Sequence, residues 1–143
     1  MIAVDTNLLV YAHRVDMPLH ERALKVLEEL VASVNSWAIP WPCVYEFISV
    51  VTNPRIFKTP SSLTIAFDVV RTWSQGGNLQ FIGEGVDFVG VLEKIVLPTK
   101  LSGARIHDGR IAAICVYHGI NELWSCDRDF SLFPKLRTKN PLV

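Results

Sequence analysis

Short apolar runs alternate with longer helix-like segments along almost the whole chain, and this alternation limits the possible folds most narrowly. Runs of strand length lie at Ile2–Val4, Trp37–Ile39, Leu79–Ile82 and Glu122–Ser125. The sequence between successive runs is long enough for the helical crossover that joins two parallel strands. We therefore predict an α/β protein with a central parallel sheet that helices cover on both faces.

The helical segments are marked by apolar periodicity and by residues that start or stop a helix. Leu19–Val31 has an apolar face, and Glu21 and Lys25 support its exposed side. Other helices are bounded by proline, serine or glycine signals. They are predicted at about Leu8–His13, Pro42–Thr52, Ser62–Ser74, Gly85–Leu97 and Ile111–Tyr117, with one turn at Asp129–Phe133 and an edge strand within Arg137–Val143.

The composition is typical of a globular protein, and we expect one domain over residues 1–143. Half of the residues are apolar and a fifth are charged, so a chain of this length can bury about two thirds of its unfolded surface. The 14 Lys and Arg balance the 14 Asp and Glu, whereas nucleic-acid-binding domains are more often basic. This neutrality disfavours a general nucleic-acid binder but allows an enzyme with a local acidic centre.

The cysteines indicate a reducing compartment. Cys43, Cys115 and Cys126 form no CxxC pair and no metal-ligand spacing with the four histidines. An odd number of cysteines without a secretion signal favours reduced thiols. No apolar stretch has the length needed to span a bilayer. We therefore expect a soluble protein of the cytoplasm.

Acidic side chains stand at element ends that a parallel sheet brings to one edge. Asp5 follows the first apolar run and Asp127 the fourth, while Glu46 and Asp108 lie at predicted helix starts. Ligands of such sheets gather beyond the carboxyl ends of the strands. Converging acids repel one another unless cations neutralise them, and oxygen-only ligands favour Mg²⁺ or Mn²⁺. The sequence therefore predicts a divalent-metal site at this edge.

Each acid also has an ordinary structural role open to it. Asp5 can cap the following helix, and Glu46 and Asp108 can complement a helix dipole. Asp127 and Asp129 can be turn residues. The convergence of all five favours the metal site, and the sequence leaves open whether Asp127 or Asp129 is the direct ligand.

A metal site of this kind predicts phosphodiester hydrolysis, in which a metal-activated water attacks phosphorus and the cations stabilise the charge on its oxygens. Thr6, Asn7 and Ser125 are expected to orient the acids. Arg110 and Arg128 are expected to contact the phosphates of the substrate because each is close in sequence to an acid. Phosphate-binding glycine loops, HExxH and GxSxG patterns are absent.

Four stretches of the chain resemble the PIN-domain ribonucleases, and specifically the VapC-type toxins of toxin–antitoxin pairs. They occur in the family's order and extend over essentially the whole chain. Gly109 is a departure, since a small residue such as alanine is expected there. The stretches are Ile2–Ala12 (IAVDTNLLVYA), Pro42–Phe47 (PCVYEF), His107–Gly119 (HDGRIAAICVYHG) and Ser125–Arg137 (SCDRDFSLFPKLR).

The resemblance implies a three-layer α/β/α sandwich and Mg²⁺- or Mn²⁺-dependent cleavage of RNA that leaves 5′-phosphate and 3′-hydroxyl ends. It implies that Asp5, Glu46, Asp108 and Asp127 are the catalytic and metal-binding acids, with Asp129 as a further metal ligand. It also implies a homodimer. A small antitoxin would inhibit the enzyme by laying a segment, often with an arginine, across the acidic centre.

Two other classes of function stay open. A catalytically silent PIN-like module would bind RNA or protein without cutting, which the complete acid set disfavours. A phosphotransferase of the haloacid-dehalogenase type needs a second aspartate two residues after Asp5, where Asn7 stands. Trp41 and Trp73 are candidates for stacking on bases, with packing in the core or at a protein interface as their other role.

Overall fold

A five-stranded, fully parallel sheet forms the centre of the computed structural model, which describes all residues 1–143. The strand order is β3-β2-β1-β4-β5, and each neighbouring pair is parallel. The predicted edge strand is present as β5. The strands are β1 (Ile2–Val4), β2 (Trp37–Pro40), β3 (Leu79–Ile82), β4 (Glu122–Trp124) and β5 (Thr138–Lys139).

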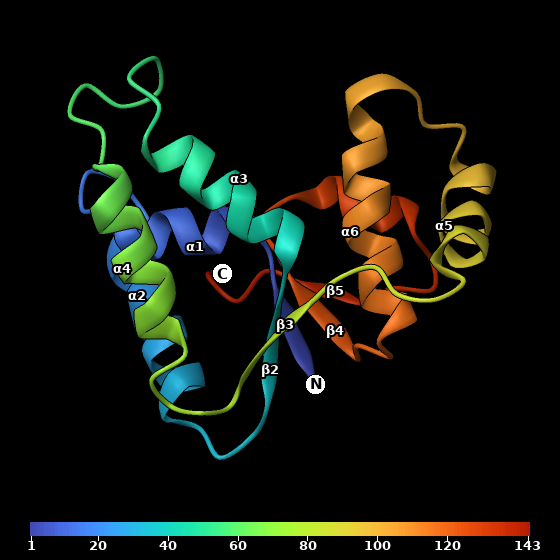
Figure 1. Cartoon of the computed structure of the whole chain (residues 1–143), viewed down its shortest axis with the longest axis horizontal. Coiled ribbons are helices and arrows are strands. Elements are labelled where there is room, and N and C mark those ends of the chain that lie inside the picture. Colours follow the sequence, from blue (N-terminus) through green and yellow to red (C-terminus); the bar gives the residue numbers. More distant parts are fainter.

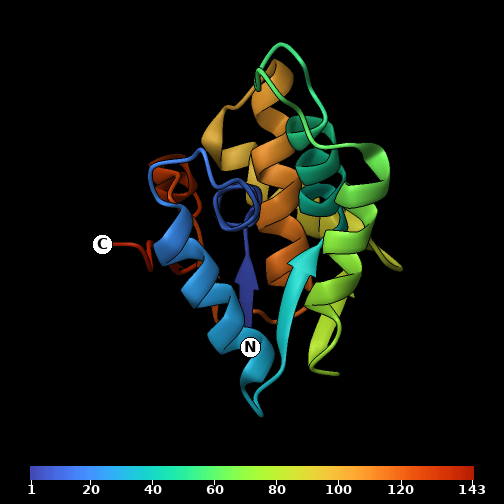
Figure 2. The same cartoon turned by 90° about the vertical axis from the view of Figure 1, so that its left-hand side faces the viewer.

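Helices cover both faces of this sheet, which confirms the predicted α/β sandwich. Figure 1 shows α1, α2 and α4 on one side of the sheet and α5 and α6 on the other, and Figure 2 turns the first side toward the viewer. Helix α3 packs against α1 and α4. The helices are α1 (Thr6–His13), α2 (His20–Ala32), α3 (Trp41–Val51), α4 (Leu63–Trp73), α5 (Phe88–Val96) and α6 (Ile106–Tyr117), with short 3₁₀ turns η1 (Leu97–Thr99), η2 (Gly103–Arg105) and η3 (Arg128–Leu132).

The central strands are apolar throughout because helices bury them from both sides. Ala3 and Val4 of β1 and Trp37 to Ile39 of β2 are completely buried. They belong to a cluster of 33 buried residues that also includes Trp73, which meets Phe47 edge to face at 4.9 Å. Trp73 is therefore a core residue, and base stacking is left to Trp41. None of the helices combines the length and the apolar character that crossing a membrane requires.

Two helices begin earlier than predicted. Helix α1 starts at Thr6 rather than Leu8 because the Asp5 carboxylate caps it and accepts the Thr6 N–H at 2.8 Å. Helix α6 starts at Ile106 rather than Ile111, since the η2 turn leads directly into it. Asp108 therefore lies in the first turn of α6.

Gly109 lets α6 lie close to α5. A Cβ atom at this position would lie 2.5 Å from Cγ2 of Val96, the last residue of α5. Even the methyl group of alanine would require the Val96 side chain to move. The departure from the family pattern thus has a packing cause, and it leaves the neighbouring Asp108 in place.

Candidate active site

The order in which the chain adds strands to the sheet reverses between β1 and β4. The candidate site lies at the carboxyl ends of these two strands. From β1 the chain passes outward to β2, whereas β4 lies on the other side of β1. The Asp5 N–H donates to the Trp124 carbonyl at 3.0 Å, so the residues that follow the two strands are held side by side. Open parallel sheets place their ligands at such a switch point.

Asp5 is the most deeply placed acid, with only 5% of its surface exposed. Its carboxylate accepts hydrogen bonds from the Ser125 hydroxyl at 2.7 Å, the Thr6 N–H at 2.8 Å and the Asn7 amide at 3.3 Å. The Cys43 thiol donates to it at 3.6 Å. Burial nevertheless raises the pKa of Asp5 to about 6, because the loss of hydration outweighs these hydrogen bonds.

Ser125 and Asn7 join the end of β1 to the end of β4. The Ser125 hydroxyl oxygen accepts the Asn7 side-chain amide at 3.2 Å and the Asp127 N–H at 3.0 Å. The Asn7 side-chain oxygen accepts the Cys126 N–H at 3.2 Å. These bonds fix the position of Asp127 relative to Asp5. The side chain of Asn7 is thus fully used in this network, at the position where a dehalogenase-type enzyme needs its second aspartate.

Glu46 reaches the same region from α3. Its Oε2 atom accepts the Thr6 hydroxyl hydrogen at 3.0 Å, which connects α3 to the start of α1. The rest of the Glu46 side chain is exposed. Thr6 therefore contacts two of the predicted acids, Asp5 through its N–H and Glu46 through its hydroxyl.

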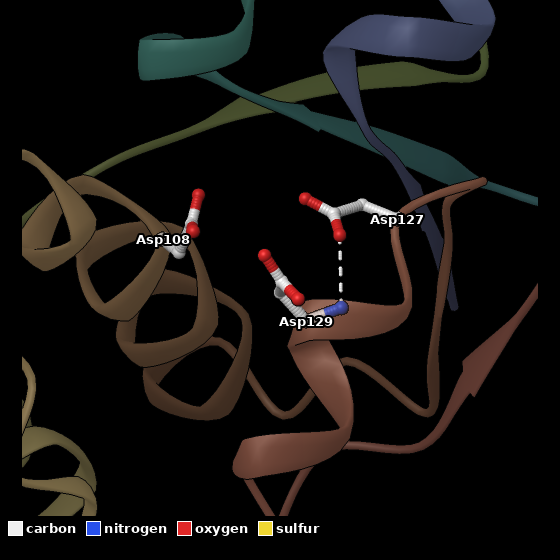
Figure 3. A group of neighbouring side chains, drawn as sticks. All are labelled: Asp108, Asp127 and Asp129. Atoms are coloured by element: carbon white, nitrogen blue, oxygen red, sulfur yellow. Dashed lines mark hydrogen bonds between the residues drawn. The ribbon is translucent and has the colours of Figure 1, made fainter.

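Asp108, Asp127 and Asp129 form the tightest acidic group, as Figure 3 shows. Each offers one oxygen atom within 4.8 Å of those of the other two. The Asp129 N–H donates to the Asp127 carboxylate at 2.8 Å. Burial raises the pKa of Asp108, and the neighbouring charges of Asp127, Asp129 and Glu46 raise it further, while Arg105 opposes them. Carboxylates that disfavour one another's ionised form are a fitting donor set for a cation.

Four of the predicted acids line one cavity of 350 Å³, which we call the acidic cavity: Asp5, Glu46, Asp108 and Asp127. Asp129 stands next to it without lining it. Asp5 and Glu46 are not within the 4.8 Å group that the three aspartates form. The donors are all oxygen atoms, which fits Mg²⁺ or Mn²⁺ better than a softer metal.

A comparison with known families gives one match, which extends over nearly the whole chain. Residues 2–136 match the PIN domain, and this span includes every acid of the site. The chain belongs to the PIN-domain family.

Relatives of this PIN domain are VapC proteins. Ribonuclease VapC43 of Mycobacterium tuberculosis (strain H37Rv) is 32% identical over 143 residues, which is 99% of this chain and 96% of the relative. Ribonuclease VapC48 of the same strain is 28% identical over 137 residues, 96% and 94% of the two chains. The structure of VapBC2 from Rickettsia felis, bound to a DNA fragment from its promoter, has a TM-score of 0.69 at 19% identity and 98% coverage of both chains. The sequences place this PIN domain in the VapC group, and the solved structure shows the same fold.

The two arginines that the sequence singled out differ in their surroundings. Arg110 of α6 is ion-paired with Glu84, and this contact holds the pKa of Glu84 below its ordinary value. Arg128 is exposed at the start of η3. A third cation, Arg105, lies 3.8 Å from the Asp129 carboxylate and is the one that influences Asp108. The prediction from sequence proximity named Arg110 and Arg128, whereas the arginine that pairs with one of the acids is Arg105.

The acidic cavity also has an apolar wall, which the sequence did not predict. This wall consists of Tyr11 and Met17, which lie between β1 and β2, and of Ile56 and Phe57, which lie in the loop after α3. Phe57 is buried although it lies in a loop, and the guanidinium carbon of Arg14 is 4.1 Å from the centre of its ring. The sequence signals only a helix end here, through Asn53-Pro54.

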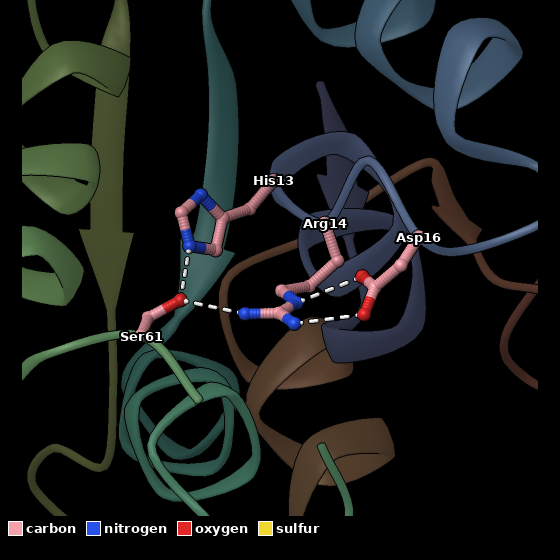
Figure 4. Close-up of polar contacts among 4 residues, drawn as sticks. All are labelled: His13, Arg14, Asp16 and Ser61. Atoms are coloured by element: carbon pink, nitrogen blue, oxygen red, sulfur yellow. Dashed lines mark hydrogen bonds and ion pairs between the residues drawn. The ribbon is translucent and has the colours of Figure 1, made fainter. Parts of the chain in front are cut away.

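A polar cluster fixes this loop to the end of α1, as Figure 4 shows. Arg14 forms two hydrogen bonds with the Asp16 carboxylate, at 2.8 and 3.0 Å, and a third with the Ser61 oxygen at 3.2 Å. Nε2 of His13 lies 2.7 Å from the same Ser61 oxygen. Because Arg14 can only donate, the Ser61 oxygen accepts this hydrogen bond. Burial lowers the pKa of His13.

Proposed function

We propose that this PIN domain is a Mg²⁺- or Mn²⁺-dependent endoribonuclease and the toxin of a type II toxin–antitoxin pair. The convergence of Asp5, Glu46, Asp108 and Asp127 on one cavity carries this proposal. The names of its relatives, Ribonuclease VapC43 and Ribonuclease VapC48, support RNA as the substrate. A phosphodiester is a fitting substrate because its anionic oxygens bind to cations that an acidic cavity gathers.

In this proposal Asp108 and Asp127 bind the catalytic cation directly. Asp127 lines the acidic cavity whereas Asp129 stands beside it and holds Asp127 through its backbone N–H. Asp5 and Glu46 line the same cavity and would add two further carboxylates to the set that holds the cation. When bound, the cation lowers the pKa of a water molecule and offsets the charge of the phosphoryl oxygens.

Thr6, Asn7 and Ser125 orient the acids. Ser125 and Asn7 both donate to Oδ2 of Asp5, and Thr6 donates to Oδ1 through its N–H. Together with the Cys43 thiol, which also donates to Oδ1, these groups give each carboxylate oxygen of Asp5 two donors and so fix its orientation at the edge of the acidic cavity. Partners of this kind tune metal affinity and activity by about ten- to a hundredfold.

Cleavage should depend on the metal. Purified protein is expected to cut end-labelled RNA with Mg²⁺ or Mn²⁺, to leave 5′-phosphate and 3′-hydroxyl ends, and to stop when EDTA removes the cation. The preparation is first checked by intact-mass measurement for a co-purified small protein, since a bound antitoxin would block the site. Cutting that persists in EDTA, or a folded and partner-free protein that cuts no RNA, would contradict the proposal, and the second result would favour the silent binding module.

We further propose a small antitoxin as partner, a homodimer as the assembled form and the cytoplasm as the location. A guanidinium group fits the acidic cavity because it can engage two carboxylate oxygens at once. The related structure is a VapBC pair, which supports an antitoxin.

Exposed apolar side chains at Val86, Val89 and Leu97 support a contact between copies. The three free cysteines support a reducing compartment. Light scattering on the isolated chain tests the dimer.

Arg110 and Arg128 are proposed to bind RNA phosphates, so their loss should reduce the salt dependence of binding. Each alanine variant is expected to lower the slope of log affinity against log salt by about one. Arg110→Ala should weaken binding more, because it also releases the charge of Glu84. Fluorescence anisotropy in an Asp108→Asn background, which prevents cutting, measures both slopes. Arg71→Ala is the matched control, since Arg71 is an exposed, ion-paired arginine of α4. Unchanged slopes in both variants would remove these residues from the RNA site.

A further inference from the structure

A second cavity meets the acidic cavity at the acids themselves. It has a volume of 550 Å³, and we call it the aromatic hollow; its walls include Tyr45 and Ser49 of α3 and His107 and Arg110 of α6. Glu46 and Asp108 line both cavities. Glu46 and Asp108 thus form a ridge between the two cavities. The acidic cavity has an apolar wall, and the aromatic hollow has the Tyr45 ring and the side chains of His107 and Arg110.

A phosphodiester bound at this ridge places a nucleoside on each side of it. A strand that crosses the ridge would place one nucleoside of the cleaved bond over each cavity. The aromatic hollow offers groups for both parts of a nucleotide: the ring of Tyr45 for a base, and Arg110 and His107 for phosphate or base edges.

Tyr45 is the last of three neighbouring aromatic rings, and most of it is exposed. Phe81 of β3 stacks on Trp41 with 4.7 Å between ring centres, and Trp41 lies 6.3 Å from Tyr45 at a tilt of 34°. Trp41 is 41% exposed and Tyr45 is 65% exposed. The row of three rings starts at the sheet edge and ends beside Glu46. An exposed ring with a fixed neighbour provides a stacking surface with little ordering cost on binding.

We propose that Tyr45 stacks on the nucleobase next to the scissile phosphate and so contributes to the choice of cleavage site. The inference rests on the ribonuclease function proposed above and adds a specificity-determining residue to it. An RNA base is favoured over a protein side chain as the occupant because the hollow is continuous with the acids and carries Arg110 and His107. A single-stranded base is the favoured occupant, since a base in a duplex would first have to leave its stack to reach the ring.

A combination of protein and substrate changes tests this contact. RNA substrates carry an abasic nucleotide on one side or the other of the cleaved bond, and single-turnover rates are measured for wild type, Tyr45→Ala and Tyr45→Phe. In wild type, one of the two abasic substitutions should slow cleavage by roughly 5- to 100-fold, the effect of losing one stacked base. In Tyr45→Ala the same abasic substitution should have almost no further effect. Tyr45→Phe should keep the wild-type penalty, because its ring still stacks.

Phe67→Ala is the matched control, since it removes another half-exposed aromatic ring from a helix, on α4 and outside both cavities. It should keep the full abasic penalty. An abasic penalty that persists undiminished in Tyr45→Ala would overturn the inference. So would a change of oligomeric state in Tyr45→Ala, seen by light scattering, since the ring would then contact a second copy. Failure of the proposed function is distinct from these outcomes, because wild type would then cut neither the intact nor the abasic RNA.

Discussion

Asp108→Asn should abolish metal-dependent RNA cleavage and leave the fold intact. Asp108 lines the acidic cavity and belongs to the group of three aspartates whose oxygens lie within 4.8 Å of one another. Asparagine keeps the shape of the side chain but removes the charge that attracts a cation. Loss of a direct ligand should cost more than the about hundredfold effect of losing an orienting partner. Single-turnover cleavage at several Mg²⁺ concentrations measures the loss.

The fold should tolerate this change because the Asp108 charge is unfavourable without a cation. Its pKa is raised by burial and by its acidic neighbours, so a neutral side chain relieves repulsion. Asp68→Asn is the control for net charge, since Asp68 is an exposed acid of α4 that pairs with Arg71. That variant should cut RNA at the wild-type rate. Full activity of Asp108→Asn at limiting Mg²⁺ would remove Asp108 from the metal site.

Asp5→Asn should also stop cleavage, and in the metal-free protein it should change how stability depends on pH. The folded pKa of Asp5 is about 6, against 3.8 for a free carboxyl group. Because the folded state binds this proton more tightly than the unfolded state, wild type is stabilised at low pH and loses that stability as pH rises from about 4 to above 6. The two pKa values correspond to a loss of about 3 kcal/mol.

Asparagine cannot titrate, so the difference between the two proteins isolates Asp5. The free energy of unfolding of Asp5→Asn, measured by urea denaturation in EDTA, should rise relative to wild type by roughly 2 kcal/mol between pH 4 and pH 8, because the unfolded carboxyl is already partly ionised at pH 4. Any constant cost of the lost Ser125 hydrogen bond leaves this change with pH unaffected. Mg²⁺ should then stabilise wild type more than the variant. A pH-independent difference would show that the buried carboxylate carries no such penalty.

Asp16→Asn is a control that should respond in the opposite sense. The hydrogen bonds from Arg14 lower the pKa of Asp16, so its carboxylate stabilises the folded state above the ordinary pKa of 3.8. That variant should therefore lose stability relative to wild type as pH rises through this range. Opposite trends in the two variants would show that burial, rather than the loss of any aspartate, sets the sign.

The sequence was sufficient to predict the parallel sheet and the edge at which the acids lie. Strands β1 and β2 are buried on both faces, so their runs are apolar throughout and easy to recognise. The first residues of two helices were predicted less accurately, because a capping side chain or a preceding turn determines where these helices begin. Asp5 caps α1, which therefore begins two residues before the predicted start, and η2 leads into α6 before its predicted start.

Features that depend on contacts across the fold could not be read from the sequence. Cys43 donates to Asp5 from α3, and nothing in its neighbourhood marks it for this role. Phe57 borders the acidic cavity only because Arg14 and Ser61 hold its loop. Arg105 approaches Asp129 because η2 turns back toward η3. In each case the partner is distant in sequence, and pairing depends on the packed structure.

The acids are divided among four segments that meet only in the complete sheet, and this division bears on synthesis. Asp5 and Asp127 become neighbours when β4 pairs with β1, and Asp108 joins them when α6 packs behind the sheet. A nascent chain that lacks β4 therefore contains Asp5, Glu46 and Asp108 but neither Asp127 nor the strand pairing that brings it beside Asp5. The acidic cavity is therefore completed only when the C-terminal part of the chain has left the ribosome, so the assembled centre is a late product of synthesis.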